Sequence, residues 1–245
     1  MKMSMVILIL CTATLVYVQV PSGSEILKKI DQNITSESKI ISSKMTIHGR
    51  RGSRTIESKS WIQGTDKAFT EYLAPAREKG TKMLKLQDQL WTYSPQTDRT
   101  IRISGHMLRQ SVMGSDLSYE DYLEDPQLHN VYEAQVEGSE PINGYDCWIL
   151  QLTSKKDDVA YDTRKIWVDR QRYVVLKENR YAKGGKLLKT IEVKSLLKIK
   201  TRWYPERVVF KDVLKSGAGT EFTVDKIEFD VPIDPYIFSK AALRK

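Results

Sequence analysis

The sequence RYVVLKENRYAKGGKLLKTIEVKSLLK, residues 172–198, contains two strand-length segments joined by a short turn. In residues 189–194 polar and apolar side chains alternate, which is typical of a β-strand with one buried face. Residues 182–186 include Gly184 and Gly185 and have the composition of a hairpin connection. This stretch therefore predicts two adjacent antiparallel strands, over 172–181 and 186–198.

The same pattern extends in both directions from this hairpin. Further strands are predicted at 40–48, 55–63, 67–73, 80–87, 89–94, 99–104, 131–138, 146–153, 163–169, 203–213 and 220–230. No crossover helices separate them, which excludes a parallel α/β fold. A meander of this length rarely stays flat. We therefore predict a mainly β protein, in which one strongly curved antiparallel sheet forms an unclosed barrel and short helices form a lid over an apolar cavity.

Three segments interrupt the strand pattern. Residues 26, 27, 30 and 34 have helical spacing, with Ser24 as the expected N-cap. Within the expected lid, residues 105–126, Ser118 and Asp121 have the spacing of a capping box and Pro126 ends the helix. A short closing helix is expected from Phe238 onward.

The amino terminus has the features of an export signal. Lys2 is the only charge before Glu25, and an apolar run is followed by small residues. We expect a signal peptide over 1–24 and one domain over 25–245. An uncleaved membrane anchor is the alternative, because residues 3–24 are just long enough to span a bilayer. Removal of the signal also removes Cys11 and leaves Cys147, which we expect to be a buried apolar residue.

The net charge of +8, from 39 basic and 31 acidic residues, is unevenly distributed. Residues 110–154 contain nine acids and no Lys or Arg, whereas both flanks are basic. Elsewhere the basic residues alternate with apolar ones, as on a solvated strand face, so we predict no nucleic-acid partner. The uneven distribution predicts a dipolar surface, with the membrane surface as a partner on its basic side.

Residues that could support catalysis or metal binding are few. His48, His106 and His129 are widely separated, and the sequence has no phosphate-binding loop or nucleophile elbow. Asp116 and Glu120 are spaced as a carboxylate pair on a helix, but acids on a helix of this kind more often form a solvated face. We therefore predict no enzyme activity, no metal, no catalytic residue and no cofactor.

Aromatic and apolar residues on the first strands are the candidate binding surface. A curved sheet must bury its concave face, and incomplete cover by the helices would leave a pocket for a lipid chain. The candidate cavity residues are Trp61, Phe69, Tyr72, Leu84, Leu86, Trp91, Tyr93, Ile101, Ile103, Met107 and Met113. The candidate lid residues are Asp116, Tyr119, Glu120 and Tyr122.

Several segments carry a resemblance to a known family. They are residues 75–84, 90–95 and 113–122, and then 144–152, 167–169, 185–189 and 203–205. In this order they resemble the bacterial outer-membrane lipoprotein-sorting proteins, a branch of the LolA-like periplasmic carriers. The segment Gly-Ser-Asp-Leu-Ser-Tyr-Glu-Asp, residues 114–121, is the most specific part of the resemblance.

The resemblance implies an unclosed barrel with a helical lid, a periplasmic location and no catalysis. It implies a monomeric lipid or lipoprotein carrier that holds acyl chains and moves them toward the outer membrane, with an inner-membrane transporter and an outer-membrane acceptor as partners. An alternative function is a sensor or accessory module of a membrane transporter or envelope-stress system, docked on a basic partner through the acidic stretch 116–146, which charge reversal at Glu120, Asp121 and Glu124 would test. A secreted hydrolase is a third, and it requires a nucleophile and base, or a carboxylate pair, in the cavity.

Overall fold

The computed structural model describes residues 20–50, 52–157 and 159–244, and within them it confirms all thirteen predicted strands. The strands are β1 (Ser38–Gly49), β2 (Gly52–Gln63), β3 (Lys67–Ala74), β4 (Lys82–Leu86), β5 (Gln89–Ser94), β6 (Arg99–Ile103), β7 (Tyr132–Ile142), β8 (Tyr145–Ser154), β9 (Thr163–Asp169), β10 (Val175–Tyr181), β11 (Leu187–Ile199), β12 (Arg202–Asp212) and β13 (Gly219–Phe229). Every pairing between them is antiparallel.

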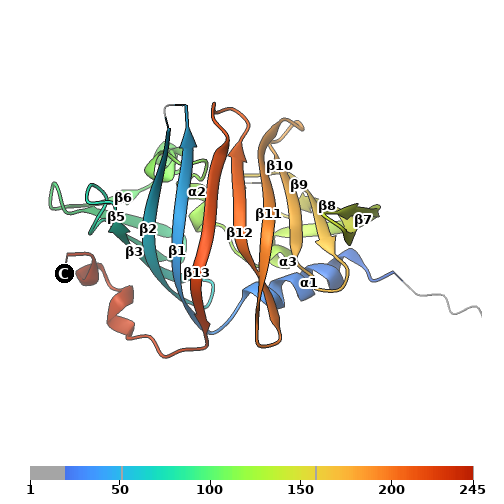
Figure 1. The fold of residues 1–245 in the computed structure, drawn as a ribbon, viewed down its shortest axis with the longest axis horizontal. Coiled ribbons are helices and arrows are strands. Elements are labelled where there is room, and N and C mark those ends of the chain that lie inside the picture. The colour runs from blue at the N-terminus through green and yellow to red at the C-terminus, as the bar shows by residue number, and fades with distance from the viewer. Residues whose placement is uncertain (1–19, 51, 158, 245) are drawn as a thin grey trace, which may run out of the picture.

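The strands form one open sheet in the order β6-β5-β4-β3-β2-β1-β13-β12-β11-β10-β9-β8-β7. Each half is a meander, and the two meanders join where β1 pairs with β13, for example at Ile41 opposite Ile227. The edge strands β6 and β7 do not pair with each other, and the sheet curls around the helices between them (Figure 1). The prediction of an unclosed antiparallel barrel is therefore confirmed.

The connection from β6 to β7 links the two edges of the sheet and therefore crosses its open side. It contains the 3₁₀ turns η1 (Gly105–Arg109) and η2 (Val112–Gly114) and the helices α2 (Tyr119–Leu123) and α3 (Leu128–Val131). The predicted capping box is present, since Ser118 and Asp121 satisfy each other's backbone groups. We call residues 105–126 the lid.

Helix α1 (Gly23–Ile34) lies beside β7 and begins two residues earlier than predicted. Ser22, not Ser24, is its N-cap and forms a capping box with Glu25. Gly23 is buried against β7, where an added Cβ atom would lie 2.2 Å from the carbonyl oxygen of Ala134. The expected signal-peptide boundary at residue 24 thus falls inside this helix, and residues 1–19 lie outside the described residues.

Both faces of the sheet bury apolar residues. On the concave face, α1 packs over strands β7 to β9 through Leu27 and Leu150, and the lid packs over the first strands through Val112 and Tyr72. On the outer face, the C-terminal 3₁₀ turns η3 (Pro235–Phe238) and η4 (Lys240–Arg244) cover part of β3, β4 and β5. These two turns take the place of the single closing helix that the sequence predicts.

Cys147 is fully buried on β8, as expected, and burial raises the pKa of its thiol to about 11. A thiol with so high a pKa is poorly nucleophilic at neutral pH. Among the described residues, no helix is long and apolar enough to span a membrane.

Candidate ligand-binding site

A cavity of about 320 Å³ lies between the concave face of the sheet and helix α2. Its floor comes from small side chains on adjacent strands. Ser60 on β2 and Thr70 on β3 are cross-strand partners, and so are Ile62 and Ala68 in the row beside them. Because the floor is lined by short side chains, the lid above it leaves space unfilled.

The floor is less polar than its residue types suggest. The hydroxyl oxygens of Ser60 and Thr70 lie 2.8 Å apart and form a hydrogen bond with each other. Deeper in the sheet, the hydroxyls of Ser43 and Ser58 pair in the same way at 3.1 Å. Paired hydroxyls need no water, so an apolar ligand can lie against them at little desolvation cost.

The walls and roof of the cavity are mainly apolar. Ile41, Tyr204, Phe210 and Phe222 line it from strands β1, β12 and β13. Leu117, Tyr122 and Pro126 line it from the lid. The volume is at the lower end of the about 300–1,000 Å³ typical of small-molecule sites. This geometry suits a narrow apolar ligand, such as part of an alkyl chain.

The mouth of the cavity is polar. It lies at the β2–β3 turn, where Gly64 and Thr65 line both the cavity and an open depression at the surface. The depression is also lined by three acids, Glu37, Asp66 and Asp230, and by Arg202. A ligand that enters at this end passes from a charged rim into a mainly apolar interior.

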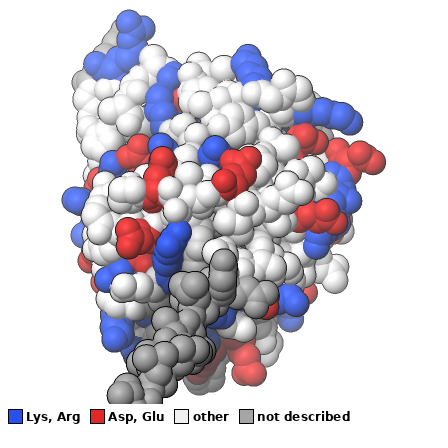
Figure 2. Space-filling view, turned by 90° about the vertical axis from the view of Figure 1, so that its right-hand side faces the viewer, with Lys and Arg blue, Asp and Glu red and all other residues white. Residues whose placement is uncertain are grey.

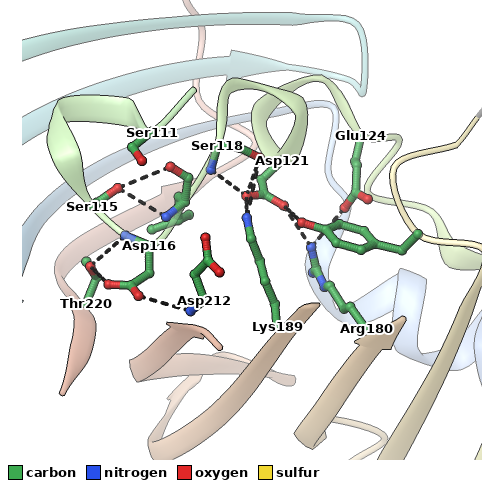
Figure 3. Close-up of polar contacts among 12 residues, drawn as sticks. Ser111, Ser115, Asp116, Ser118, Asp121, Glu124, Arg180, Lys189, Asp212 and Thr220 are labelled. Atoms are coloured by element: carbon green, nitrogen blue, oxygen red, sulfur yellow. Dashed lines mark hydrogen bonds and ion pairs between the residues drawn. The ribbon is translucent and has the colours of Figure 1, made fainter. Parts of the chain in front are cut away.

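Two buried carboxylates in the lid attach it to the sheet, and Asp116 is the first. Its backbone N–H donates to the Thr220 hydroxyl at 2.9 Å, and that hydroxyl donates back to Asp116 Oδ2 at 2.7 Å. Asp116 Oδ1 also accepts from the backbone N–H of Asp212 at 3.0 Å. Figure 3 shows this carboxylate pointing from the lid toward β12 and β13.

The second attachment is an ion network around Asp121 in α2. Arg180 on β10 lies 3.2 Å from Asp121 Oδ1, and Lys189 on β11 contacts the other carboxylate oxygen (Figure 3). Tyr161 donates its hydroxyl to Asp121 at 2.7 Å. Burial raises the pKa of Asp121, but Arg180 and Lys189 outweigh burial and lower it to about 2.

Glu124, at the end of α2, extends the same network to β9. Its carboxylate lies 2.5 Å from Arg164 and 3.2 Å from Arg180. Both arginines also pair with Glu178 on β10. Burial alone would raise the pKa of Glu178, but the charges of Arg180 and Arg164 outweigh burial and lower that pKa. The network therefore holds the lid shut with charges that are compensated inside the protein.

The structure divides the predicted cavity residues between the two faces of the sheet. Six of them pack on the outer face against the C-terminal turns: Trp61, Phe69, Leu84, Leu86, Trp91 and Tyr93. The expectation that they face the concave side is wrong for these six. The physical reason is that the first strands bury apolar residues on both faces. Phe69 and Tyr72, on the same strand, point to opposite faces, and both are apolar, so the residue type does not reveal which of them is on the concave side.

The other predicted cavity residues lie on the lid side but do not line the cavity. Tyr72, Ile103, Met107 and Met113 pack with the lid in one apolar cluster next to it. Ile101 is 45% exposed on edge strand β6. The cavity is displaced from them toward the centre of the sheet, because the 3₁₀ turns fill the space over β5 and β6.

The predicted lid residues have different surroundings. Tyr122 lines the cavity, and Tyr119 packs in the cluster beside it. Asp116 anchors the lid, whereas Glu120 is 30% exposed and lies 3.7 Å from Arg109. Asp116 precedes α2, so it does not form a helical carboxylate pair with Glu120.

The acidic segment is less polarised in the structure than in the sequence. Within the acidic stretch 116–146 expected to dock a basic partner, the Asp121 side chain is buried and the Glu124 side chain half-buried, and both form ion pairs. Glu137 on β7 pairs with Lys165 at 3.0 Å. On the face that contains α1 and β7, acidic and basic side chains are interspersed (Figure 2). The predicted docking surface over residues 116–146 therefore loses the charges of Asp121 and Glu124, which are paired inside the protein.

Sequence reasoning missed the residues that make the cavity. Ser60, Ala68 and Thr70 carry no signal except small size at alternating positions, and Phe210 and Phe222 are far from them in the sequence. Arg164, Arg180 and Lys189 appear in the sequence as ordinary strand residues. Within the described residues, no group of His, Cys, Asp and Glu side chains is arranged to hold a metal ion.

Comparison with known proteins identifies similar chains. A family model described as an uncharacterised protein matches residues 64–245. The structure of a DUF1329 family protein from Desulfovibrio piger is 26% identical, with a TM-score of 0.83, and the match covers 90% of this chain and 97% of that one. No curated protein matches the sequence.

Two further structures share the fold. One is a putative outer membrane lipoprotein-sorting protein domain from Vibrio parahaemolyticus, 23% identical with a TM-score of 0.80, over 91% of this chain and 98% of that one. The other is a LolA superfamily protein from Nitrosomonas europaea, 23% identical with a TM-score of 0.76, over 91% of this chain and 100% of that one.

Proposed function

Because the chain belongs to the family whose model matches residues 64–245, and shares its fold with LolA-like and lipoprotein-sorting proteins, we propose that it is an exported, non-catalytic carrier that holds a lipid acyl chain beneath its lid. The observation that carries this proposal is the cavity of about 320 Å³ between α2 and the small-residue floor of the sheet. The periplasm is its proposed location, and lipids or lipoproteins passing between the two membranes are its proposed cargo.

The apolar lining supplies enough free energy for carriage. Burial of each CH₂ group contributes about 0.8 kcal/mol, so a chain of about ten carbons gains roughly 8 kcal/mol before its ordering cost. That gain is consistent with binding that is firm but reversible. The chain would lie on Ala68 and Thr70 and be covered by Leu117 and Tyr122.

Release requires the lid to move away from the sheet. Toward β9–β13 the lid is held by polar groups at Asp116, Asp121 and Glu124, which water can replace once they separate, whereas toward the first strands it is held by the apolar cluster around Val112 and Tyr72. Transfer partners in the two membranes, a transporter that loads the carrier and an acceptor that unloads it, belong to the same proposal.

The proposal is tested by filling the cavity. Ala68→Phe places a ring on the floor without removing a hydrogen bond, and we expect it to weaken binding of a fluorescent fatty acid at least tenfold. The matched control is Thr55→Phe, which adds the same ring at an exposed position of β2. Circular dichroism and thermal unfolding establish that both variants are folded.

Equal probe binding by the wild type, Ala68→Phe and Thr55→Phe would place the probe outside this cavity. Absence of binding to delipidated wild-type protein would refute carriage of an acyl chain. Fractionation of cells that express the full chain tests the periplasmic location separately, since the mature protein should appear in the periplasmic fraction.

A further inference from the structure

Three lysines line the cavity beneath the lid, together with Asp121, Glu124 and mainly apolar side chains. Lys67, at the start of β3, is exposed, whereas the other two lie further inside. Lys39 on β1 and Lys85 on β4 stand at the two ends of one cross-strand row, with Ile62 and Ala68 between them. Directly opposed residues in a sheet project from the same face, so both lysines belong to the concave side. The row lies next to the β2–β3 turn, at the mouth end of the cavity.

Lys39 is a cation without a counter-ion. Its Nζ atom donates to the carbonyl oxygen of Ile34 at 2.7 Å and lies 5.8 Å from the centre of the Tyr204 ring. Within the part of the chain that the structure describes, it forms no ion pair. An ammonium group has three donors, so it can donate to a further acceptor in the cavity.

The surroundings of Lys39 disfavour its charge. Burial, assisted by the nearby positive charge of Arg202, lowers the pKa of Lys39 to about 8. Arg202 itself donates to backbone carbonyls at the end of α1, at Gln32 and Thr35. An anion placed beside Lys39 would therefore be attracted to it and would also offset the unfavourable burial of the Lys39 charge and its repulsion from Arg202.

Lys85, unlike Lys39, donates hydrogen bonds to the lid. Its Nζ atom donates to the carbonyl oxygens of Leu123 and Glu124, at 3.3 Å each, and so binds the C-terminal end of α2. Burial lowers its pKa, while the charges of Asp125, Asp66 and Glu124 oppose that shift. Lys39 is thus the cation with the stronger requirement for a ligand.

The acids that also line the cavity do not neutralise Lys39. Asp121 and Glu124 are paired with Arg180, Arg164 and Lys189 on the far side of the lid. Outside the lysine row, the mouth is lined by three acids, Glu37, Asp66 and Asp230, and by one cation, Arg202, so it is acidic on balance. A bulky, multiply charged head that projected from the mouth would meet these acids, so a small head fits better than a large one.

We propose that the cargo is a single-chain lipid that ends in a compact oxyanion, a carboxylate or a phosphate, bound by Lys39. This inference rests on the proposed function and names its class of ligand. The oxyanion accepts hydrogen bonds from Lys39 near the mouth, and the alkyl chain lies over Ala68 and Thr70 toward Phe222.

The test compares three ligands of equal chain length: dodecanoate, dodecyl phosphate and dodecan-1-ol. Their dissociation constants are measured by calorimetry for the wild type, for Lys39→Met and for Lys59→Met. Lys59 lies on the outer face of β2, over Trp61, and serves as the matched control. Met keeps the length of the side chain and removes its charge.

We expect the wild type to bind at least one anionic ligand about tenfold to a hundredfold more tightly than the alcohol, as for a charge-assisted hydrogen bond. Lys39→Met should abolish that preference and leave the affinity for dodecan-1-ol unchanged, while Lys59→Met should change neither. The preferred anion identifies the head group.

The inference is overturned if the alcohol and both anions bind alike, or if Lys39→Met retains the preference for the anion. Either result leaves the carrier function intact, because the alcohol still binds. If none of the three ligands binds to the wild type, the carrier function and this inference both fail.

Discussion

Asp121 is the residue that joins the largest number of groups in the lid. Its carboxylate accepts the backbone N–H of Ser118 at 2.7 Å, which caps α2, and it also accepts from Tyr161, Arg180 and Lys189. One side chain thus determines both the start of the helix and its attachment to β10 and β11. Removing a buried charge of this kind leaves its partners uncompensated, which costs about 3–5 kcal/mol.

This carboxylate predicts how the lid responds to acid. Its pKa is about 2 in the folded protein and 3.8 when unperturbed, so the unfolded chain binds the proton first as the pH falls. The stabilisation is complete above about pH 4 and is lost between about pH 4 and pH 2. It amounts to about 2 kcal/mol.

Urea unfolding at a series of pH values, with amide exchange of residues 116–124, measures this effect. The free energy of unfolding should decrease over that interval, and exchange in the lid should increase with it. In Asp121→Asn the pH-dependent loss should become smaller. A wild-type protein whose stability does not change between pH 4 and pH 2 would contradict the assignment.

At the scale of elements, α1 is positioned by close contact as well as by its apolar face. Ile26, Leu27 and Ile30 bury the expected face against β8 and β9. The first turn then approaches β7 so closely that only glycine fits at position 23. Because Ser22 and Gly23 belong to the folded unit, we propose that the mature chain begins at or before Ser22.

Gly23→Ala should therefore destabilise the protein, although alanine is normally the better helix former. The new Cβ atom would lie 2.2 Å from the carbonyl oxygen of Ala134, so the helix must shift, and we expect a loss of about 1–3 kcal/mol. The control is Gly138→Ala on β7, the strand that contains Ala134, because a Cβ atom added at Gly138 has nothing within 4 Å. Urea unfolding should show a change for the first variant only; equal stability of the two would refute the close contact.

The strands and the capped helix in the lid could be predicted from the sequence, because both are local properties. Alternation in residues 189–194 identifies β11, and the spacing of Ser118 and Asp121 identifies the start of α2. The counter-ions of the acidic lid could not be predicted in this way. Arg180 and Lys189 follow Asp121 by 59 and 68 residues, and only the order of the strands brings them together.

At the scale of the whole molecule, the sheet has a separate apolar core on each face. Phe238, Ala242 and Leu243 of the C-terminal turns cover Phe69, Leu84 and Trp91 on the outer face. Alternation shows which residues share a face, but it does not show which face is concave. This explains why the aromatic residues of the first strands belong to the outer core, and why the cavity was not predicted at its true position.

This arrangement predicts a structural role for the C-terminal turns. Phe238 is 7% exposed, and Phe238→Ala should lower the free energy of unfolding by about 3 kcal/mol or more through the lost contacts and the space left behind. Leu214→Ala removes an apolar side chain that is 63% exposed and should have an effect below about 0.5 kcal/mol.

Thermal and urea unfolding of the two variants provide the measurement, and binding of the fluorescent fatty acid provides a second one. Because Phe238 is on the face opposite the cavity, probe affinity should be unchanged where the variant is folded. A large loss of stability in Leu214→Ala, or none in Phe238→Ala, would contradict the account of the outer core.

The join between β1 and β13 has a consequence for when the binding site comes into existence. Ile41 and Ile62 come from the first meander, whereas Phe210 and Phe222 come from the second, and all four line the cavity. Neither meander encloses a pocket by itself. During synthesis, the amino-terminal half leaves the ribosome long before β13 does, so a partly made chain has no place for a lipid. Competence to take up the proposed lipid cargo therefore coincides with completion of the fold.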